Sequence, residues 1–111
     1  MRSGRLRWLV TIEHSPEPQN RGELGGYEAQ WVPLAEVFAE INPLNGRALE
    51  AAQSRHGEVT AEIRIRYRED VMDAMRVAYR GNVYAIHYVY NVKNQYRELI
   101  LGCSLGTSDG G

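Results

Sequence analysis

Apolar residues occupy every second position in residues 58–68. The apolar side of this stretch is made of Val59, Ala61, Ile63, Ile65 and Tyr67. Such a period of two is typical of a half-buried β-strand, because successive side chains point to opposite faces of a sheet. At roughly 3.3 Å per residue the stretch would span about 36 Å. We expect it to be the central strand of an antiparallel β-fold.

Shorter alternating stretches occur on both sides of this one and predict about six strands in all. They are residues 8–13, 31–41, 75–79, 83–92 and 99–105. Pro33 restricts its end of the second strand to an edge or an entry position, because proline cannot donate to a ladder. Gly81 follows the fourth strand and can adopt a positive φ at little cost, so we expect a hairpin into the fifth.

The alternation of period two predicts which side chains form the apolar face of the fifth and sixth strands. In residues 83–92 the alternation places Tyr84, Ile86, Tyr88 and Tyr90 on one side, and the other side is apolar as well. We therefore expect that strand to be covered on both faces. In the last strand the inner face should run from Leu99 through Leu101 and Cys103 to Leu105.

Three segments lack the alternation. Residues 15–30 hold two prolines and three glycines and are expected to form a long flexible loop, and residues 106–111 a frayed tail. Within residues 43–57 good helix formers run from Arg47 to Ser54, which predicts a short helix inserted between the second and third strands. The predicted fold class is mainly β, a small antiparallel barrel or sandwich of about six strands.

Length and charge limit the class of protein. The chain has 111 residues, and we expect it to form one domain, residues 1–111, that can fold alone. The formal net charge is −1, so no strong field argues for nucleic acid or an anionic membrane. No run approaches the roughly 18 apolar residues that span a bilayer, and the N-terminus lacks an apolar signal core. We expect a soluble protein without membrane contact.

The sequence offers little for catalysis or metal binding. Cys103 is the only cysteine, so we expect it to pack as a small hydrophobe. The three histidines lack the helical spacing of a metal site, and His87 is expected to be a satisfied core residue. No nucleophile elbow, P-loop or dinucleotide fingerprint occurs. We expect no enzyme activity, no cofactor and no metal.

One set of side chains allows two interpretations. The basic positions are Arg64, Arg66 and Arg68, and the aromatic ones are Tyr84, Tyr88 and Tyr90. Together they could form the basic and aromatic surface of a module that binds single-stranded nucleic acid. Alternatively, the tyrosines are core or subunit contacts and the arginines form ion pairs. The expected acidic partners are Glu58, Glu62 and Glu98. The second interpretation is preferred.

Several short motifs follow one another along the chain. They are Gly4-Arg5-Leu6-Arg7 before Val10-Thr11-Ile12, Val37-Phe38-Ala39-Glu40-Ile41-Asn42-Pro43-Leu44-Asn45-Gly46-Arg47, Ile63-Arg64-Ile65-Arg66-Tyr67-Arg68, Met75-Arg76-Val77, Tyr79, Gly81, Tyr84 and Ile86, Glu98-Leu99 and Cys103. In this order they resemble the head–tail joining or head-closure proteins of long-tailed bacteriophages, prophages and gene-transfer particles. Phe38 stands where tryptophan is usual, and residues 70–74 lack the proline or glycine often found there. Neither departure touches an expected functional group.

The resemblance implies a structural protein that forms a ring, typically dodecameric, below the portal and its adaptor ring. Such a ring closes the DNA-filled head and offers a surface to which the tail docks. The segment between the second and third strands, here residues 43–57, then reaches toward the channel. Its expected channel residues are Leu44, Asn45, Gly46, Arg47 and Glu50. Subunit or partner contacts are expected at Arg5, Arg7, Tyr27, Trp31, Arg64, Arg66 and Arg68.

The expected partners follow from this resemblance. They are copies of the chain, the portal–adaptor ring, the tail terminator or tail tube, and the double-stranded DNA that passes through the channel. The protein would reside in the virion neck, and in the host cytoplasm during assembly. Another neck ring, such as the tail terminator, is the alternative. Unpaired edge strands would suit ring contacts, and without a large apolar patch we expect a monomer in isolation.

Overall fold

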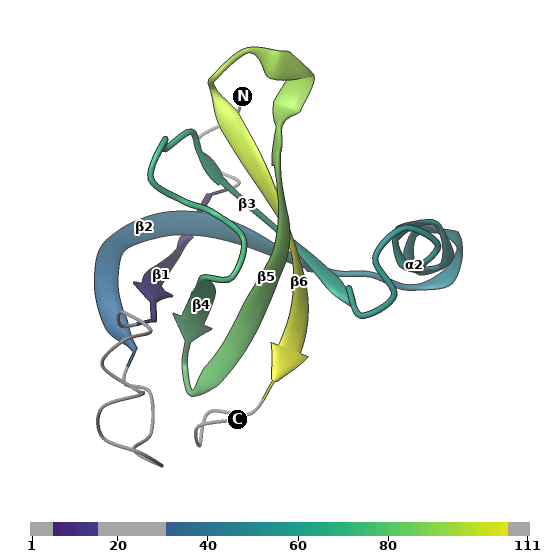
Figure 1. Ribbon diagram of the computed structural model, residues 1–111, viewed down its shortest axis with the longest axis horizontal. Coiled ribbons are helices and arrows are strands. Elements are labelled where there is room, and N and C mark those ends of the chain that lie inside the picture. Colours follow the sequence, from purple (N-terminus) through teal and green to yellow (C-terminus); the bar gives the residue numbers. More distant parts are fainter. Residues whose placement is uncertain (1–5, 16–30, 107–111) are drawn as a thin grey trace, which may run out of the picture.

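The structure of the protein is a computed structural model, and the residues that it describes are 6–15 and 31–106. Six strands form a closed antiparallel barrel in the order β1-β2-β3-β6-β5-β4 (Figure 1). The strands are β1 Trp8–His14, β2 Val32–Pro43, β3 Ala61–Arg66, β4 Arg76–Tyr79, β5 Asn82–Asn91 and β6 Glu98–Gly106. Helix α2, Gly46–Gln53, lies between β2 and β3, and a 3-10 turn η2, Val92–Asn94, joins β5 to β6. The predicted fold class is confirmed, and the architecture is the barrel.

The core lies between the inner faces of all six strands. Ile63 of β3 pairs with Leu101 of β6, and both side chains have no exposed surface. Strand β3 has six residues and is shorter than the alternation suggested. Val59 is nevertheless fully buried, and Tyr67 packs against the core. The alternating pattern therefore marked burial correctly, although the hydrogen-bonded ladder covers only its middle.

Strand β2 closes the barrel because it pairs with different neighbours along its length. Its first part pairs with β1 and its last part with β3, and Ala39 has a partner in both. Pro33 pairs with Glu13, where the β1–β2 register shifts. Such an irregularity tolerates a proline. Pro33 is the second residue of β2, so the predicted entry position is confirmed. Each strand has two neighbours, so the unpaired edge strands expected for ring contacts are not found in this barrel.

The β4–β5 hairpin matches its prediction. Tyr79 pairs with Asn82, and the two residues between them, Arg80 and Gly81, have φ values of +51° and +83°. Two positive φ angles are what a tight hairpin turn of the I′ kind requires, because its backbone twist then matches that of the strands. Gly81 adopts this conformation without a side-chain penalty.

Strand β5 differs from its prediction because its register shifts between Ile86 and Tyr88. Tyr84 and Ile86 are buried and Val89 packs against the core, whereas Tyr90 is 50% exposed. An irregularity of this kind moves later side chains to the opposite face. The expectation that the four alternating positions share one covered face was therefore wrong. The same holds for the end of β6, where Leu105 is 55% exposed.

Candidate functional site

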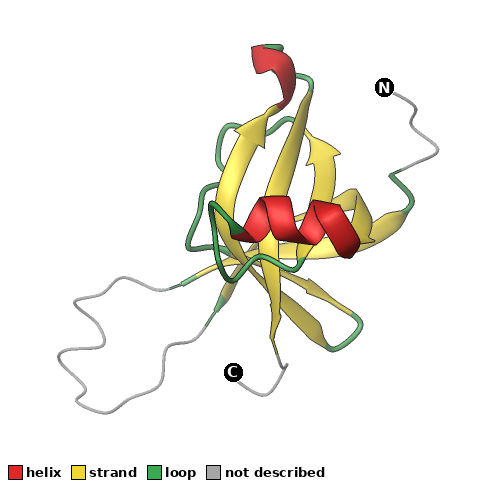
Figure 2. Cartoon of the chain, turned by 90° about the vertical axis from the view of Figure 1, so that its right-hand side faces the viewer, coloured by secondary structure: helices red, strands yellow, loops and turns green. Residues whose placement is uncertain are grey.

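In Figure 1 the insertion between β2 and β3 stands away from the barrel, and Figure 2 looks from that side, with α2 in front of the strands. Helix α2 has no buried residue. The residues predicted for the channel come together at the start of this insertion. Leu44 is half-buried and its N–H donates to the Thr60 carbonyl at 2.9 Å, whereas the other four are exposed. Asn45 and Gly46 turn the chain into the helix, with extended backbone at the first and a φ of +55° at the second.

The C-terminal end of α2 is attached to the barrel by a few polar and ring contacts. The Gln53 side-chain amide donates to the Val59 carbonyl at 3.1 Å. The His56 and Tyr88 rings lie 4.7 Å apart between centroids. The Tyr88 hydroxyl in turn donates to a Glu62 carboxylate oxygen at 3.4 Å. The helix is thus held at one end, and its N-terminal half, with Arg47 and Glu50, is presented to solvent.

A groove of about 640 Å³ separates α2 from the outer face of the barrel. It is lined by Ala48, Ala51, Ala52, Arg55, His56, Glu62, Tyr88, Val89, Tyr90 and Ile100. Alanine side chains on the helix side are too short to reach the sheet, which leaves the gap open. We call this feature the α2 groove. Sequence reasoning missed it, because the register shift that turns Tyr88 and Tyr90 outward leaves no mark in the alternation.

Tyr88 can line this groove only because its partner on the neighbouring strand is Gly102, which has no side chain. The two residues pair across β5 and β6, and a Cβ atom at Gly102 would overlap the Tyr88 ring. An aromatic ring over a cross-strand glycine covers the backbone that the missing side chain leaves bare. Burial first, and the nearby Glu62 carboxylate second, raise the pKa of the Tyr88 hydroxyl above its ordinary value. It therefore stays a neutral donor.

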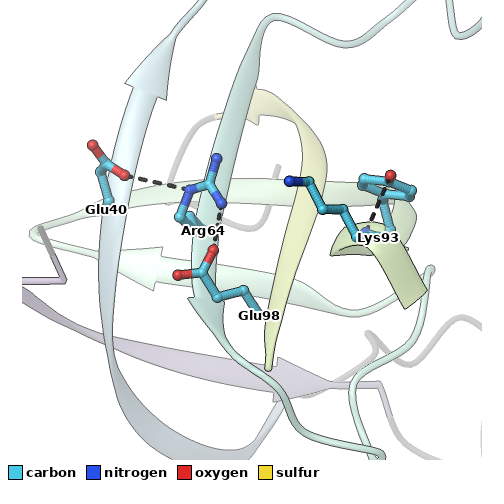
Figure 3. A network of polar contacts seen from close by, with 5 residues as sticks. Glu40, Arg64, Lys93 and Glu98 are labelled. Atoms are coloured by element: carbon cyan, nitrogen blue, oxygen red, sulfur yellow. Dashed lines mark hydrogen bonds and ion pairs between the residues drawn. The ribbon is translucent and has the colours of Figure 1, made fainter. Parts of the chain in front are cut away.

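Arg64 is held between two carboxylates on the outer face of the barrel (Figure 3). Its Nη1 donates to Glu98 Oε1 at 2.5 Å, and its Nε lies 3.6 Å from Glu40 Oε1. Glu98 is only 8% exposed. The predicted pairing with Glu98 is therefore confirmed. Arg64 belongs to an internal ion-pair network, and its charge is compensated within the chain.

The other two arginines of this strand region differ from Arg64. Arg68 makes a bidentate pair with Asp70, with N–O distances of 3.0 and 2.9 Å. Hydrogen bonding to the Arg68 guanidinium lowers the pKa of the Asp70 carboxyl. Arg66 is exposed. Because Tyr84 is buried and two of the arginines are neutralised, the basic and aromatic surface for single-stranded nucleic acid, the less favoured interpretation, is not assembled.

The remaining acidic residues considered as partners have other contacts. Glu58 lies 3.7 Å from His87 Nε2, and Glu62 accepts from Tyr88, so their predicted pairing with arginines was wrong. His87 is half-buried rather than in the core, and its Nε2 lies 2.7 Å from the Ser104 hydroxyl. The expected core position was therefore wrong, although Nε2 has a hydrogen-bond partner.

The N-terminal contact residues are placed only in part. Arg5 and Tyr27 lie outside the described residues. Arg7 is exposed, with its guanidinium 5.5 Å from the centre of the Trp8 ring. Trp31 is half-buried beneath Arg76, whose guanidinium lies 4.4 Å from the ring centre. Glu13 accepts a hydrogen bond from Arg76 Nε at 2.6 Å, so these cations also have internal partners.

The chemistry available in the described part of the chain is limited. Cys103 has no exposed surface, and burial raises the pKa of its thiol to about 12. It packs as a small hydrophobe, as predicted. Within residues 6–15 and 31–106 there is no group of three or more His, Cys, Asp or Glu side chains that could hold a metal ion. No helix in the same residues is long and apolar enough to cross a membrane.

Comparison with known proteins identifies the family. The family described as "Phage head completion protein" matches residues 1–106. This chain belongs to the phage head completion protein family. The resemblance drawn from the sequence motifs is thereby confirmed, and the protein is a structural component of phage head completion. A structural family of this kind fits the expectation of a protein that is not an enzyme.

Solved structures share the fold of this head completion protein. The solution structure of protein SF1141 from Shigella flexneri 2a is 27% identical, covers 96% of this chain and 97% of its own, and has a TM-score of 0.68. A chain of the virion of a native gene transfer agent particle is 17% identical and has a TM-score of 0.57. The match covers 89% of this chain and 93% of that chain. Among curated proteins no sequence matches this chain.

Proposed function

We propose that this head completion protein forms a ring in the neck that joins a phage-like head to its tail. The ring closes the DNA-filled head below the portal and adaptor and offers the tail its docking surface. The family match over residues 1–106 carries this proposal. The likeness in fold to a chain of a gene transfer agent virion is consistent with it.

The insertion is the part of the chain best suited to the channel. Helix α2 has no buried residue and stands apart from the barrel (Figure 1). Its charges are mixed, with Arg47 and Glu50 both exposed. A strongly basic channel would hold phosphates through counterion release, whereas mixed charge allows a duplex to slide. We therefore assign Leu44, Asn45, Gly46, Arg47 and Glu50 to the channel side of the ring.

The direct test is assembly on the upstream rings. Purified protein is mixed with portal–adaptor complexes and imaged by electron microscopy. We expect an added ring of density on the face that points away from the head. Complexes that remain unchanged at saturating protein would contradict the proposal.

A second candidate is another ring of the same neck, such as the tail terminator, because both would be small structural rings. The neighbour distinguishes the two. A head-closure ring binds portal–adaptor complexes, whereas a tail terminator binds the end of a tail tube. The same imaging with isolated tails therefore serves as the counter-experiment, and added density on tails alone would favour the terminator.

A further inference from the structure

Two apolar cross-strand pairs lie on the outer face of the barrel. Leu9 of β1 pairs with Phe38 of β2, and these side chains are 48% and 57% exposed. We call them the β1–β2 ridge. Tyr90 of β5 pairs with Ile100 of β6, and both line the α2 groove. Exposed apolar side chains grouped in this way mark surfaces that bind another molecule more often than isolated ones do.

The ridge and the groove lie on opposite sides of the barrel. In the closed order β1-β2-β3-β6-β5-β4, β1 is three positions from β6 and β2 is three positions from β5. Figure 1 shows β1 and the start of β2 on the left and α2 on the right. Two different surfaces on opposite sides are what a head-to-tail contact between identical copies requires, and such contacts close into rings.

The ridge and the groove differ in the size of their side chains, and each has a residue of opposite charge. The α2 groove is open because its helix side carries only small apolar side chains, and the ridge offers two large ones. Arg55 lines the groove. Glu36 is exposed and lies two residues before Phe38, on the same face of β2. A ridge seated in the groove would bring these opposite charges together, which favours this orientation over others.

We propose that Leu9 and Phe38 of one copy seat in the α2 groove of the next copy around the ring. This inference rests on the proposed ring function. Side chains must make the contact, because the closed barrel leaves no edge strand for strand addition. Two side chains bury far less than the roughly 1,200 Å² of a stable interface. The contact therefore forms when neighbouring rings hold the copies together, and an isolated chain remains monomeric.

Disulfide cross-linking in the assembled ring tests the contact. The full chain carries Phe38→Cys together with Ala51→Cys, which places one thiol on the ridge and one in the groove. The native Cys103 has no exposed surface and does not interfere. The protein is added to portal–adaptor complexes, oxidised, and run on a denaturing gel without reductant. We expect a ladder that extends beyond the dimer, because each copy links to two neighbours, and monomers alone from either single variant.

The matched control pair is Met72→Cys with Ala51→Cys, since Met72 is as exposed as Phe38 but lies outside the ridge. It should give no ladder. Ring density from the test pair without a ladder overturns the inference while leaving the ring function intact. Links from Ala51→Cys to the adaptor also overturn it, because another protein then fills the groove. Absence of ring density for the unmodified chain removes the proposed function and this contact together.

A charge on the ridge provides a second readout. Phe38→Glu should leave the barrel folded, because the side chain is on the outer face, and should weaken ring formation by about tenfold or more, since buried aromatic anchors dominate interfaces. Leu105→Glu is the matched control, with an equally exposed apolar side chain at the end of β6. Equal ring formation by both variants in a titration against portal–adaptor complexes contradicts the ridge contact.

Discussion

The interior of β3 and helix α2 are neighbours in the chain but opposites in burial. Ile63 and Ile65 have no exposed surface, whereas no residue of α2 is buried. Hydrophobic stabilisation grows with the apolar area removed from water, so the barrel interior supplies the stability and α2 supplies little. The chain therefore separates the residues that keep it folded from those that it leaves exposed.

Truncating one side chain in each region should give the largest difference in stability. Ile63→Ala should lower the free energy of unfolding by about 2–5 kcal/mol, because it leaves a cavity in a closely packed core. Leu49→Ala in α2, where the side chain is half-buried, should cost less than about 1 kcal/mol. Urea unfolding of both variants measures the difference. Similar losses at the two sites would show that α2 is part of the folding core.

The outer face of β3 allows a finer comparison between two arginines. Arg64→Met removes the partner of Glu98, a carboxylate only 8% exposed, and should cost about 1–3 kcal/mol. Arg66→Met changes an exposed side chain two residues further on. It should leave the free energy of unfolding within about 0.5 kcal/mol of that of the unmodified chain. Chemical denaturation of the pair gives the comparison. A cost at Arg66 equal to that at Arg64 would mean that the network around Arg64 contributes nothing of its own.

The boundary between the barrel and the α2 groove depends on Gly102. Gly102→Ala places a Cβ atom into the Tyr88 ring and should cost about 1–3 kcal/mol. In a Tyr88→Ala background the same change should cost clearly less, because the ring no longer occupies that space. A double-mutant cycle by thermal unfolding measures this coupling. Two independent, additive losses would show that the ring and the glycine do not constrain each other.

The smallest expected effect is a pH dependence at Arg68 and Asp70. The pKa of Asp70 is lowered in the folded protein, so this pair stabilises the fold above the unfolded carboxyl pKa of about 4. The contribution is lost as the pH falls through the lower folded value. The pair is partly exposed, so the effect is small. Asp70→Asn should reduce the loss of stability between pH 7 and pH 3, and an unchanged profile would assign that loss to other carboxylates.

The strands and the helix could be predicted because alternation and helix formers are local properties. Val59 and Tyr67 were placed correctly even beyond the ends of β3. The outward turn of Tyr88 could not be predicted, because the register shift after Ile86 depends on pairing with β6. Closure of the barrel was equally hidden, since it depends on β2 serving two neighbours.

The candidate site could be predicted only in outline. The insertion at residues 43–57 was found from its helix formers and its place between two strands. The pairing of Arg64 with Glu98 was predicted, whereas the contacts of Glu58 and Glu62 were not, because partners on an outer face depend on strand register. The α2 groove and the β1–β2 ridge join residues from distant strands, and so they needed the three-dimensional structure.

We propose that the insertion serves assembly without holding the fold together. The decisive measurement is made on one variant, in which residues 45–54 are replaced by a short glycine–serine linker. We expect an unfolding free energy within about 1 kcal/mol of the unmodified chain, together with particles that fail to retain DNA or attach tails. Arg47→Glu should show a weaker form of the same defect. A variant that unfolds readily, or one that yields normal infectious particles, would contradict the account.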